Sequence, residues 1–386
     1  MTKVSKLFNE FFISEKAGGL LLLFCTMVSL TFANSFLQKE YFSIWHFGIA
    51  GSSFEHWIND GLMAVFFLLI GLELERELYI GELSKIKNAV LPFIAAVGGI
   101  ILPAGIHLAL NAGSTTQAGA GIPMATDIAF ALGILSLLGK WVPLTLKIFL
   151  TAFAVIDDLG AIIVIAVFYT NVLSILNLGI AFGIFFILLL LNRLKVYSLI
   201  PYLIGGFGMW YFILHSGVHA TIAGVLLAFA IPFRGKEEKS PSEKLLHFLH
   251  KPVAFFILPL FALANTAIVI KSDLISNLVS ANSLGIFLGL LIGKPIGITL
   301  FSFIAVTLGL SSLPGNVKMK EIIGVGFLGG IGFTMSIFIT LLAFNDEVLI
   351  SSSKLTILVT SAIAAIIGFL ILHFSLKPLP DEITIE

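Results

Sequence analysis

Long apolar runs separated by short polar stretches dominate the hydrophobic pattern of the chain. A helix rises about 1.5 Å per residue and the hydrocarbon core of a bilayer is about 30 Å thick, so about 20 apolar residues span it. Runs of spanning length begin near Ala17, Asn59, Ala89, Gly121, Pro143, Val172, Tyr197, Gly217, Pro252, Ser283, Ile322 and Leu355. The pattern predicts an all-α polytopic membrane protein with about twelve transmembrane helices.

One hydrophilic stretch divides the chain. RGKEEKSPSEK, from Arg234 to Lys244, is the most polar segment between two long apolar regions. We expect a single membrane transporter domain over residues 1–386, with a first half over about 1–233, a cytoplasmic loop over 234–251 and a second half over about 252–386.

The distribution of Lys and Arg predicts the orientation of the helices, because cytoplasmic loops are enriched in both residues. With the N-terminus inside, all but four of the 22 basic residues fall on the cytoplasmic side. The exceptions are Lys39, Lys271 and Lys354 outside, and Lys294 within a span. This alternation predicts that both termini are cytoplasmic.

The first 16 residues precede the apolar run that begins near Ala17. Val4, Leu7, Phe8, Phe11 and Phe12 share one helical face, a pattern typical of a helix on the membrane surface. We therefore expect a short interfacial helix before the first span, and favour it over a cleaved signal peptide.

Composition excludes several classes. The chain of 386 residues is 58% hydrophobic and 11% charged, with a mean hydropathy of +1.07, whereas soluble proteins have about 25% charged residues. The formal net charge is zero, so nucleic-acid binding is not indicated. The single cysteine, Cys25, cannot form an internal disulfide.

Two adjacent carboxylates lie inside one predicted span. Between Lys147 and Arg193 the only formal charges are Asp157 and Asp158, in IFLTAFAVIDDLGAIIVIAVF. A charged residue at the centre of a membrane helix costs about 2.5–3.5 kcal/mol on insertion scales. The pair therefore predicts a site for a cation, for a proton, or for both in turn.

Two further charges are isolated in apolar stretches. Asp127 lies in GIPMATDIAFALG, beside the hydroxyl of Thr126, and Lys294 lies in LLIGKPIGI. Neighbouring helix residues point about 100° apart, so Asp157 and Asp158 cannot face one ligand equally. We expect Lys294 to be the counter-charge of one of them, and periodicity does not say which.

Glycine and proline interrupt two of the predicted spans, one in each half. Gly121 and Pro123 precede Asp127, and FLGGIGFTMSIFI contains Gly329, Gly330 and Gly332. Such interruptions in both halves are typical of transporters built from inverted repeats with broken helices crossing at mid-membrane. The alternative, close helix packing, is our interpretation of Gly98-Gly99 and Gly205-Gly206.

These features together predict an exchange chemistry. Na⁺ prefers oxygen ligands, which carboxylates, a threonine hydroxyl, carbonyls and water supply. Burial moves a carboxyl pKa from about 4 toward neutrality, so one group can hold either a proton or a metal ion. If more than one group changes protonation per cycle, transport is electrogenic.

Six segments resemble the NhaA-type sodium/proton antiporters. They occur in the family's order over nearly the whole chain: WINDGLMAVFFLLIGLELEREL, IPMATDIAFALG, LKIFLTAFAVIDDLGAIIVIAVFYTN, SGVHATIAGV, LLIGKPIGI and GIGFTMSIFI. The resemblance implies inverted repeats with two broken helices and export of Na⁺, and of Li⁺, in exchange for H⁺. It implies no cofactor beyond the transported ions, a bacterial inner membrane location, and regulation by pH.

The resemblance also assigns roles. It implies that Asp158 is the preferred metal ligand, with Asp157 and Thr126 contributing, and that Asp157 pairs with Lys294. Asp127 would offset the positive ends of half-helices at the crossing. The external segment 45–57, which contains a predicted β-hairpin, resembles the family's homodimer contact.

In the family, the cytoplasmic funnel and pH sensor correspond here to Glu73, Arg76 and Glu77, which share one helical face, and to His219. The chain departs from the family pattern at Glu75 and His215, where a basic residue is expected, and at Leu246, where an acidic one is expected. The alternative to a sensor is an ion pair at the interface. We interpret His107, His247 and His250 as ordinary interfacial residues, and leave Asp60 open between a structural and a functional role.

Other functions fit the sequence less well. An intramembrane aspartyl protease takes its carboxylates from two helices, one of them in a GxGD context that is absent here, and a metalloenzyme needs clustered ligands, whereas the histidines are scattered. We therefore expect a transporter and not an enzyme. The alternative is a sodium-coupled symporter of an organic solute on a related fold.

Overall fold

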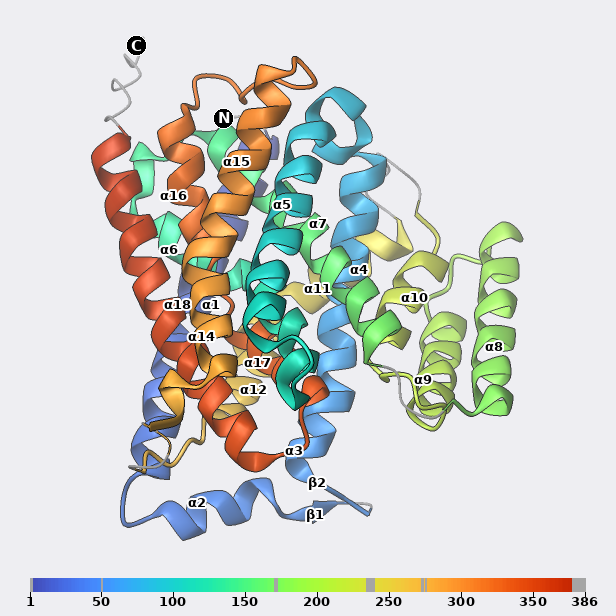
Figure 1. Ribbon diagram of the computed structural model, residues 1–386. Helices are drawn as coiled ribbons and strands as arrows, with labels where there is room; N and C mark the ends of the chain where they lie inside the picture. The colour runs from blue at the N-terminus through green and yellow to red at the C-terminus, as the bar shows by residue number, and fades with distance from the viewer. Residues whose placement is uncertain are drawn as a thin grey trace.

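The computed structural model describes residues 3–49, 51–169, 173–233, 240–271, 274 and 276–376, and this part of the chain is almost entirely helical (Figure 1). Its α-helices are α1 (Lys3–Ala33), α2 (Gln38–Trp45), α3 (Phe54–His56), α4 (Met63–Tyr79), α5 (Ile86–Asn111), α6 (Ile128–Leu137), α7 (Leu144–Phe168), α8 (Ile175–Arg193), α9 (Ile200–Leu214), α10 (Ile222–Ala230), α11 (Pro241–Pro252), α12 (Leu258–Asn265), α14 (Ala281–Leu288), α15 (Lys294–Thr307), α16 (Met319–Gly329), α17 (Phe333–Ala343) and α18 (Glu347–Ser375). The 3₁₀ and π segments are η1 (Trp57–Leu62), η2 (Glu82–Ser84), η3 (Thr115–Met124), η4 (Gly139–Trp141), η5 (Val253–Ile257), η6 (Asn277–Val279) and η7 (Gly289–Gly293).

Eight helical stretches of the described residues are long and apolar enough to span a bilayer, and two bent helix pairs raise the number to ten. The eight stretches are Lys16–Ala33, Phe54–Tyr79, Ile86–Asn111, Leu144–Phe168, Ile175–Arg193, Pro241–Asn265, Ala281–Thr307 and Glu347–Ser375. The predicted all-α polytopic fold is therefore confirmed.

The other two predicted spans correspond to the shorter helices α9 and α10. With 15 and 9 residues, they extend about 22 and 14 Å, less than the core of a bilayer. The short α10 packs closely against α4. At Gly224 the two backbones approach so closely that a Cβ atom would meet the Ala64 carbonyl of α4. The first residues of the predicted polar loop, 234–239, lie outside the described residues.

The two interrupted spans are broken helices, as the glycine and proline positions predict. One pair is η3 and α6, bent by 41°, and the other is α16 and α17, bent by 46°. The halves are separated by residues 125–127 in the first pair and by 330–332 in the second, none of which belongs to a helix. Two spans are thus unwound at depth, where backbone groups become available to side chains.

The predicted separate interfacial helix at the N-terminus is wrong, because residues Lys3–Ala33 form one continuous helix, α1. No proline lies in this segment, so nothing in the backbone stops the helix before the apolar run begins.

The predicted β-hairpin is present. Strands β1 (Gly48–Ile49) and β2 (Ser52–Ser53) are antiparallel, with Gly48 opposite Ser53 and Ile49 opposite Ser52. Gly51 has φ +89°, a left-handed conformation that glycine adopts without strain. Figure 1 shows the hairpin at one end of the bundle, and the start of α1 and the end of α18 at the other.

Close glycine contacts join the helices around the centre. Gly98 of α5 faces the Gly297 backbone of α15, and Gly205 and Gly206 of α9 face leucine side chains of α8 and α10. The expected packing role of these glycines is confirmed. The contact between α5 and α15 also fixes the helix that begins with Lys294.

Candidate functional site

The two adjacent aspartates lie at the centre of the protein on α7, an apolar helix of 25 residues. Asp157 is 0% exposed and Asp158 is 2% exposed. One oxygen of each, Oδ1, is buried without a hydrogen-bond partner. Buried polar atoms normally have a partner, so these two oxygens are candidate ligands for a cation or proton.

Asp157 is ion-paired with Lys294. The Lys294 ammonium lies 2.7 Å from Oδ2 of Asp157, and both side chains are fully buried. Lys294 also donates to the Met124 carbonyl and lies 6.0 Å from the ring centroid of Phe153. The pairing implied by the resemblance is therefore confirmed.

Hydrogen bonds hold the two broken helices where they cross. The Asp127 amide donates to the Ile331 carbonyl (2.7 Å), and the hydroxyl of Thr126 donates to the Gly329 carbonyl (2.8 Å). Ser336 on α17 donates to the Ile122 carbonyl of η3 (2.7 Å). Backbone groups freed by unwinding one helix thus pair with the other.

Asp127 caps two half-helices at once. Its Oδ1 accepts from the Phe130 amide in the first turn of α6 (3.0 Å), and its Oδ2 accepts from the Thr334 amide in the first turn of α17 (3.0 Å). The Thr334 hydroxyl donates to the same oxygen (2.5 Å). A carboxylate at a helix N-terminus offsets the positive end of the helix dipole, and here one charge serves two such ends.

Asp158 is deeply buried, and four other charged side chains lie near it. Asp157, Asp127, Lys294 and Glu73 all act on it electrostatically. Three of these four are acidic, so a bound cation is favoured there. Thr126 lies close enough to interact with Asp157. The four central charges and Thr126, predicted from separate segments, therefore form one cluster.

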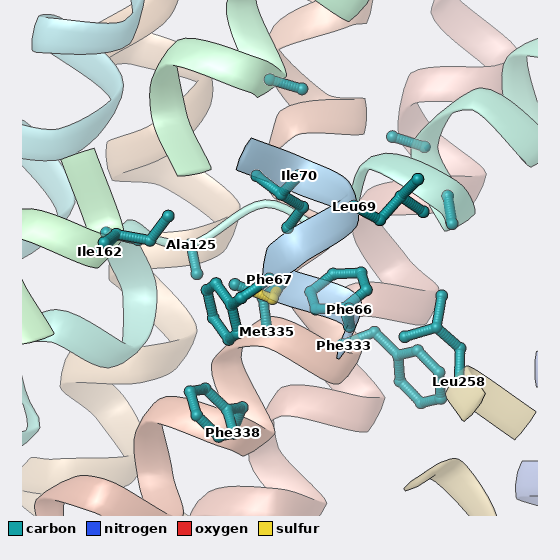
Figure 2. Packing of buried hydrophobic residues seen from close by; sticks show 14 of the residues in the cluster. Phe66, Phe67, Leu69, Ile70, Ala125, Ile162, Leu258, Phe333, Met335 and Phe338 are labelled. Atoms are coloured by element: carbon teal, nitrogen blue, oxygen red, sulfur yellow. The ribbon is translucent and has the colours of Figure 1, made fainter. Parts of the chain in front are cut away.

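Aromatic and aliphatic side chains pack between α4 and the second broken span. Figure 2 shows Phe67 of α4 beside Ala125 and Met335, and Phe66 beside Phe333. The rings of Phe67 and Phe338 are 5.4 Å apart. The central charges are themselves buried, and interactions between charges are stronger away from water.

A small cavity of about 40 Å³ lies beside α6. Its lining includes Glu73 of α4, Ile128, Leu132 and His250 of α11. Nδ1 of His250 is 3.9 Å from Oε1 of Glu73. We expected His250 to be an ordinary interfacial residue, and its place beside Glu73 depends on the approach of α11 to α4, which periodicity does not predict.

The predicted group of Glu73, Arg76 and Glu77 lies together, since Arg76 and Glu77 both act electrostatically on Glu73. Arg76 contacts Glu77, with Nη2 and Oε1 3.1 Å apart, whereas Glu73 faces His250. Glu75, the residue that departs from the family pattern, is buried and accepts a hydrogen bond from Ser242 of α11 (2.7 Å). The C-terminal part of α4 therefore contacts α11 through two acidic residues.

His219 lies apart from these residues. Its Nε2 is 2.7 Å from the Tyr169 carbonyl, and it interacts electrostatically with Asp60. Asp60 precedes Glu73 by 13 residues, about 20 Å along the helix. His219 therefore lies far along the bundle from Glu73, and a role for both residues in pH sensing stays a prediction. The Tyr169 hydroxyl donates to the Ala118 carbonyl of η3 (2.6 Å), so His219 is connected to the first broken span instead.

Some site residues were not predicted individually. Three such groups hydrogen-bond at the crossing of the broken helices. Thr334 donates to Asp127, Ser336 donates to the Ile122 carbonyl, and the Met124 carbonyl accepts from Lys294. Thr334 and Ser336 lie in GIGFTMSIFI, whose glycines drew attention to the segment, but their partners are more than 200 residues away in the chain.

The geometry is that of oxygen atoms gathered around buried charges. Among the described residues, no group of three or more His, Cys, Asp or Glu side chains has the arrangement of a metal site. Carboxylate and hydroxyl oxygens of Asp157, Asp158 and Thr126 suit a hard monovalent cation, which would be a transported substrate.

Comparison with known proteins agrees with this arrangement. The family model described as Na⁺/H⁺ antiporter 1 matches residues 9–372. The chain is 64% identical over 375 residues to the Na⁺/H⁺ antiporter NhaA of Flavobacterium psychrophilum, covering 97% of this chain and 98% of the relative. It is 59% identical over 385 residues to the NhaA of Cytophaga hutchinsonii, covering 100% of both chains. Identity at this level over the whole length, together with the family match, establishes that the chain belongs to the NhaA family of Na⁺/H⁺ antiporters, which are transporters and not enzymes.

Proposed function

We propose that this protein is a secondary active antiporter that exports Na⁺, and also Li⁺, in exchange for H⁺. Family membership supports the exchange, and the alternative of a sodium-coupled symporter has no support from the relatives. The observation that carries the assignment to residues is the different environment of two adjacent carboxylates: Asp157 is paired with Lys294, whereas Oδ1 of Asp158 is buried and unpartnered among acidic neighbours.

In this proposal Asp158 binds a proton or a Na⁺ ion, and never both. Na⁺ requires the ionised carboxylate, so loading the cation displaces the proton. The unpartnered oxygen of Asp157 and the hydroxyl of Thr126 supply further ligands. If Asp157 or Lys294 also changes protonation when Na⁺ binds, more than one proton crosses per Na⁺ and transport is electrogenic.

Alternating access would come from the crossing itself. The two spans are unwound at the same depth and are joined there by a few hydrogen bonds and by Asp127. Small rotations of the half-helices would expose Asp158 to one side and then to the other, in the manner of transporters with broken helices. Asp127 would remain as the cap of both halves.

Regulation by pH is proposed for the cytoplasmic end of α4. Glu73 contacts both the small cavity and His250, and also acts electrostatically on Asp158. A protonation change at this end would therefore alter the field at the ion site. His219 would act separately, through Tyr169 and η3.

We further propose a homodimer in the bacterial inner membrane, with both termini cytoplasmic. The external segment 45–57 would form the dimer contact, because its two-stranded hairpin has an exposed edge strand, β1. Such an edge can pair with a second copy. The hairpin lies opposite the end where α1 starts and α18 ends (Figure 1), which fits this orientation.

Everted membrane vesicles test the exchange. With an acidic interior and a pH-sensitive dye, addition of NaCl or LiCl is expected to raise the internal pH without any organic solute, whereas choline chloride is not. The assay covers pH values from about 6.5 to 9, where shifted carboxylates and histidines titrate. A response that requires an organic solute, or none at any pH in this range, would contradict antiport.

A further inference from the structure

An apolar groove of about 420 Å³ lies between α15 and α16, away from the ion site. Its wall is formed by Leu291, Ile292, Pro295, Ile296, Thr299, Leu300, Phe303, Met319, Ile323 and Phe327. Thr299 is the only polar residue of this wall. Ile292, Ile296, Leu300 and Phe303 are exposed, so the groove opens onto the outer surface of the protein. The two helices that form it, α15 and α16, lie side by side (Figure 1).

The length of the groove matches one leaflet of a bilayer. Leu291 and Phe303 are 12 residues apart in one helical stretch, about 18 Å along its axis. Half of the hydrocarbon core is about 15 Å thick. The groove begins near Lys294, at the depth of the ion site, and ends beside Met319, where α16 starts.

The volume of the groove fits a lipid acyl chain and is too small for an α-helix. A helix of 18 Å length and 10 Å diameter fills roughly 1,400 Å³, more than three times the volume of the groove. A second protein helix could insert only side chains. A single extended acyl chain is both long and thin, and it can lie along the whole groove.

The end of the groove at Met319 carries positive charge. Lys318 and Lys320 flank Met319, and both are exposed. The nearest acidic residue in the sequence, Glu321, is buried and accepts a hydrogen bond from the Lys318 amide (2.9 Å). Two exposed lysines thus lie at this end, and basic residues at the end of a membrane helix attract anionic lipid headgroups.

We propose that this groove binds one anionic phospholipid, with an acyl chain between α15 and α16 and the headgroup phosphate held by Lys318 and Lys320. The lipid would contact both the helix that begins with Lys294 and the first half of the second broken span. Pro295 lines the groove and also faces Gly326 of α16. A bound chain therefore stabilises the packing of α16 beside the ion site.

Lipid binding to the purified full-length protein in detergent tests this proposal. Titration with dioleoylphosphatidylglycerol and dioleoylphosphatidylcholine, followed by native mass spectrometry, is expected to show about 30-fold tighter binding of the anionic lipid. This factor corresponds to about 1 kcal/mol for each of two lysines. Glycerol phosphate, which has the charge but no chain, is expected not to bind.

Two variants separate charge from shape. The charge variant, Lys318→Gln/Lys320→Gln, should bind both lipids equally. The variant Leu300→Trp, whose larger side chain fills the groove, should bind neither lipid. If Leu300→Trp is not monodisperse, Ile296→Trp fills the groove in its place. The matched control is Lys85→Gln/Lys87→Gln, which changes an exposed basic pair at the start of α5 and should keep the preference. Equal affinities in the unmodified protein, binding unaffected by the filling variants, or equal loss in the control would overturn the proposal.

Discussion

Replacing Asp158 with Asn is expected to lower the rate of Na⁺-dependent H⁺ movement in everted vesicles by a factor of about 1,000, while the protein remains folded and inserted. Two unit charges 4 Å apart interact by about 4 kcal/mol at an effective dielectric constant of 20. Removing the carboxylate charge forfeits this attraction for the cation, and about 1.4 kcal/mol corresponds to a factor of ten. The amide introduced at position 158 also cannot release or bind a proton at the pH of the assay, from about 6.5 to 9.

The matched control is Glu40→Gln, which removes one exposed acidic charge from α2 and is expected to transport normally. Thermal unfolding in detergent checks that both variants are folded. Transport by Asp158→Asn at more than a tenth of the unmodified rate would show that another group carries the ions.

Lys294→Met is expected to reduce the free energy of unfolding by about 3–5 kcal/mol. Removing one member of a buried ion pair leaves an uncompensated charge, and this cost has that magnitude. Asp157 would lose its 2.7 Å contact, and the Met124 carbonyl would lose a donor. Thermal and denaturant unfolding of the purified variant in one fixed detergent measure the effect.

The double variant Lys294→Met/Asp157→Asn distinguishes the lost ion pair from lost packing. Without the carboxylate charge, most of the stability should return, because an apolar side chain next to a neutral amide leaves no buried charge. A double variant as unstable as Lys294→Met alone would mean that packing against Phe153 and its neighbours, and not charge compensation, accounts for the loss.

The chemistry of the site could be predicted from sequence because ionised residues in apolar spans are rare. Three long apolar runs contain charged residues: Asp127 in one, Lys294 in another and the adjacent Asp157 and Asp158 in the third. The glycines near residue 330 indicate a break in a helix. These are local signals: each depends on residues within one helix turn or one span.

The contacts that assemble the site could not be predicted in the same way, because they join distant segments. Thr126 and Gly329, 203 residues apart, meet only when both spans unwind at the same depth. The approach of His250 to Glu73 depends on how α11 packs against α4. The separation of His219 from Glu73 also depends on packing, since both residues belong to family motifs and neither motif encodes a distance.

The sequence predicts which segments are helical better than it predicts where each helix begins and ends. The apolar run near Gly217 is long enough to span, but residues 215–221 form turns and α10 begins only at Ile222. At the N-terminus, amphipathic and apolar segments join without a break in α1. Hydropathy measures the preference for lipid, whereas the ends of a helix depend on local backbone geometry and on neighbours.

The most direct test of the central claim, that Na⁺ and H⁺ compete for Asp158, is the number of protons released when Na⁺ binds to the purified protein in weakly buffered detergent. The account predicts release of at least one proton per Na⁺ bound, with Na⁺ affinity falling about tenfold for each unit that pH drops below the pKa of the site. Na⁺ binding without proton release, at an affinity independent of pH, would contradict it.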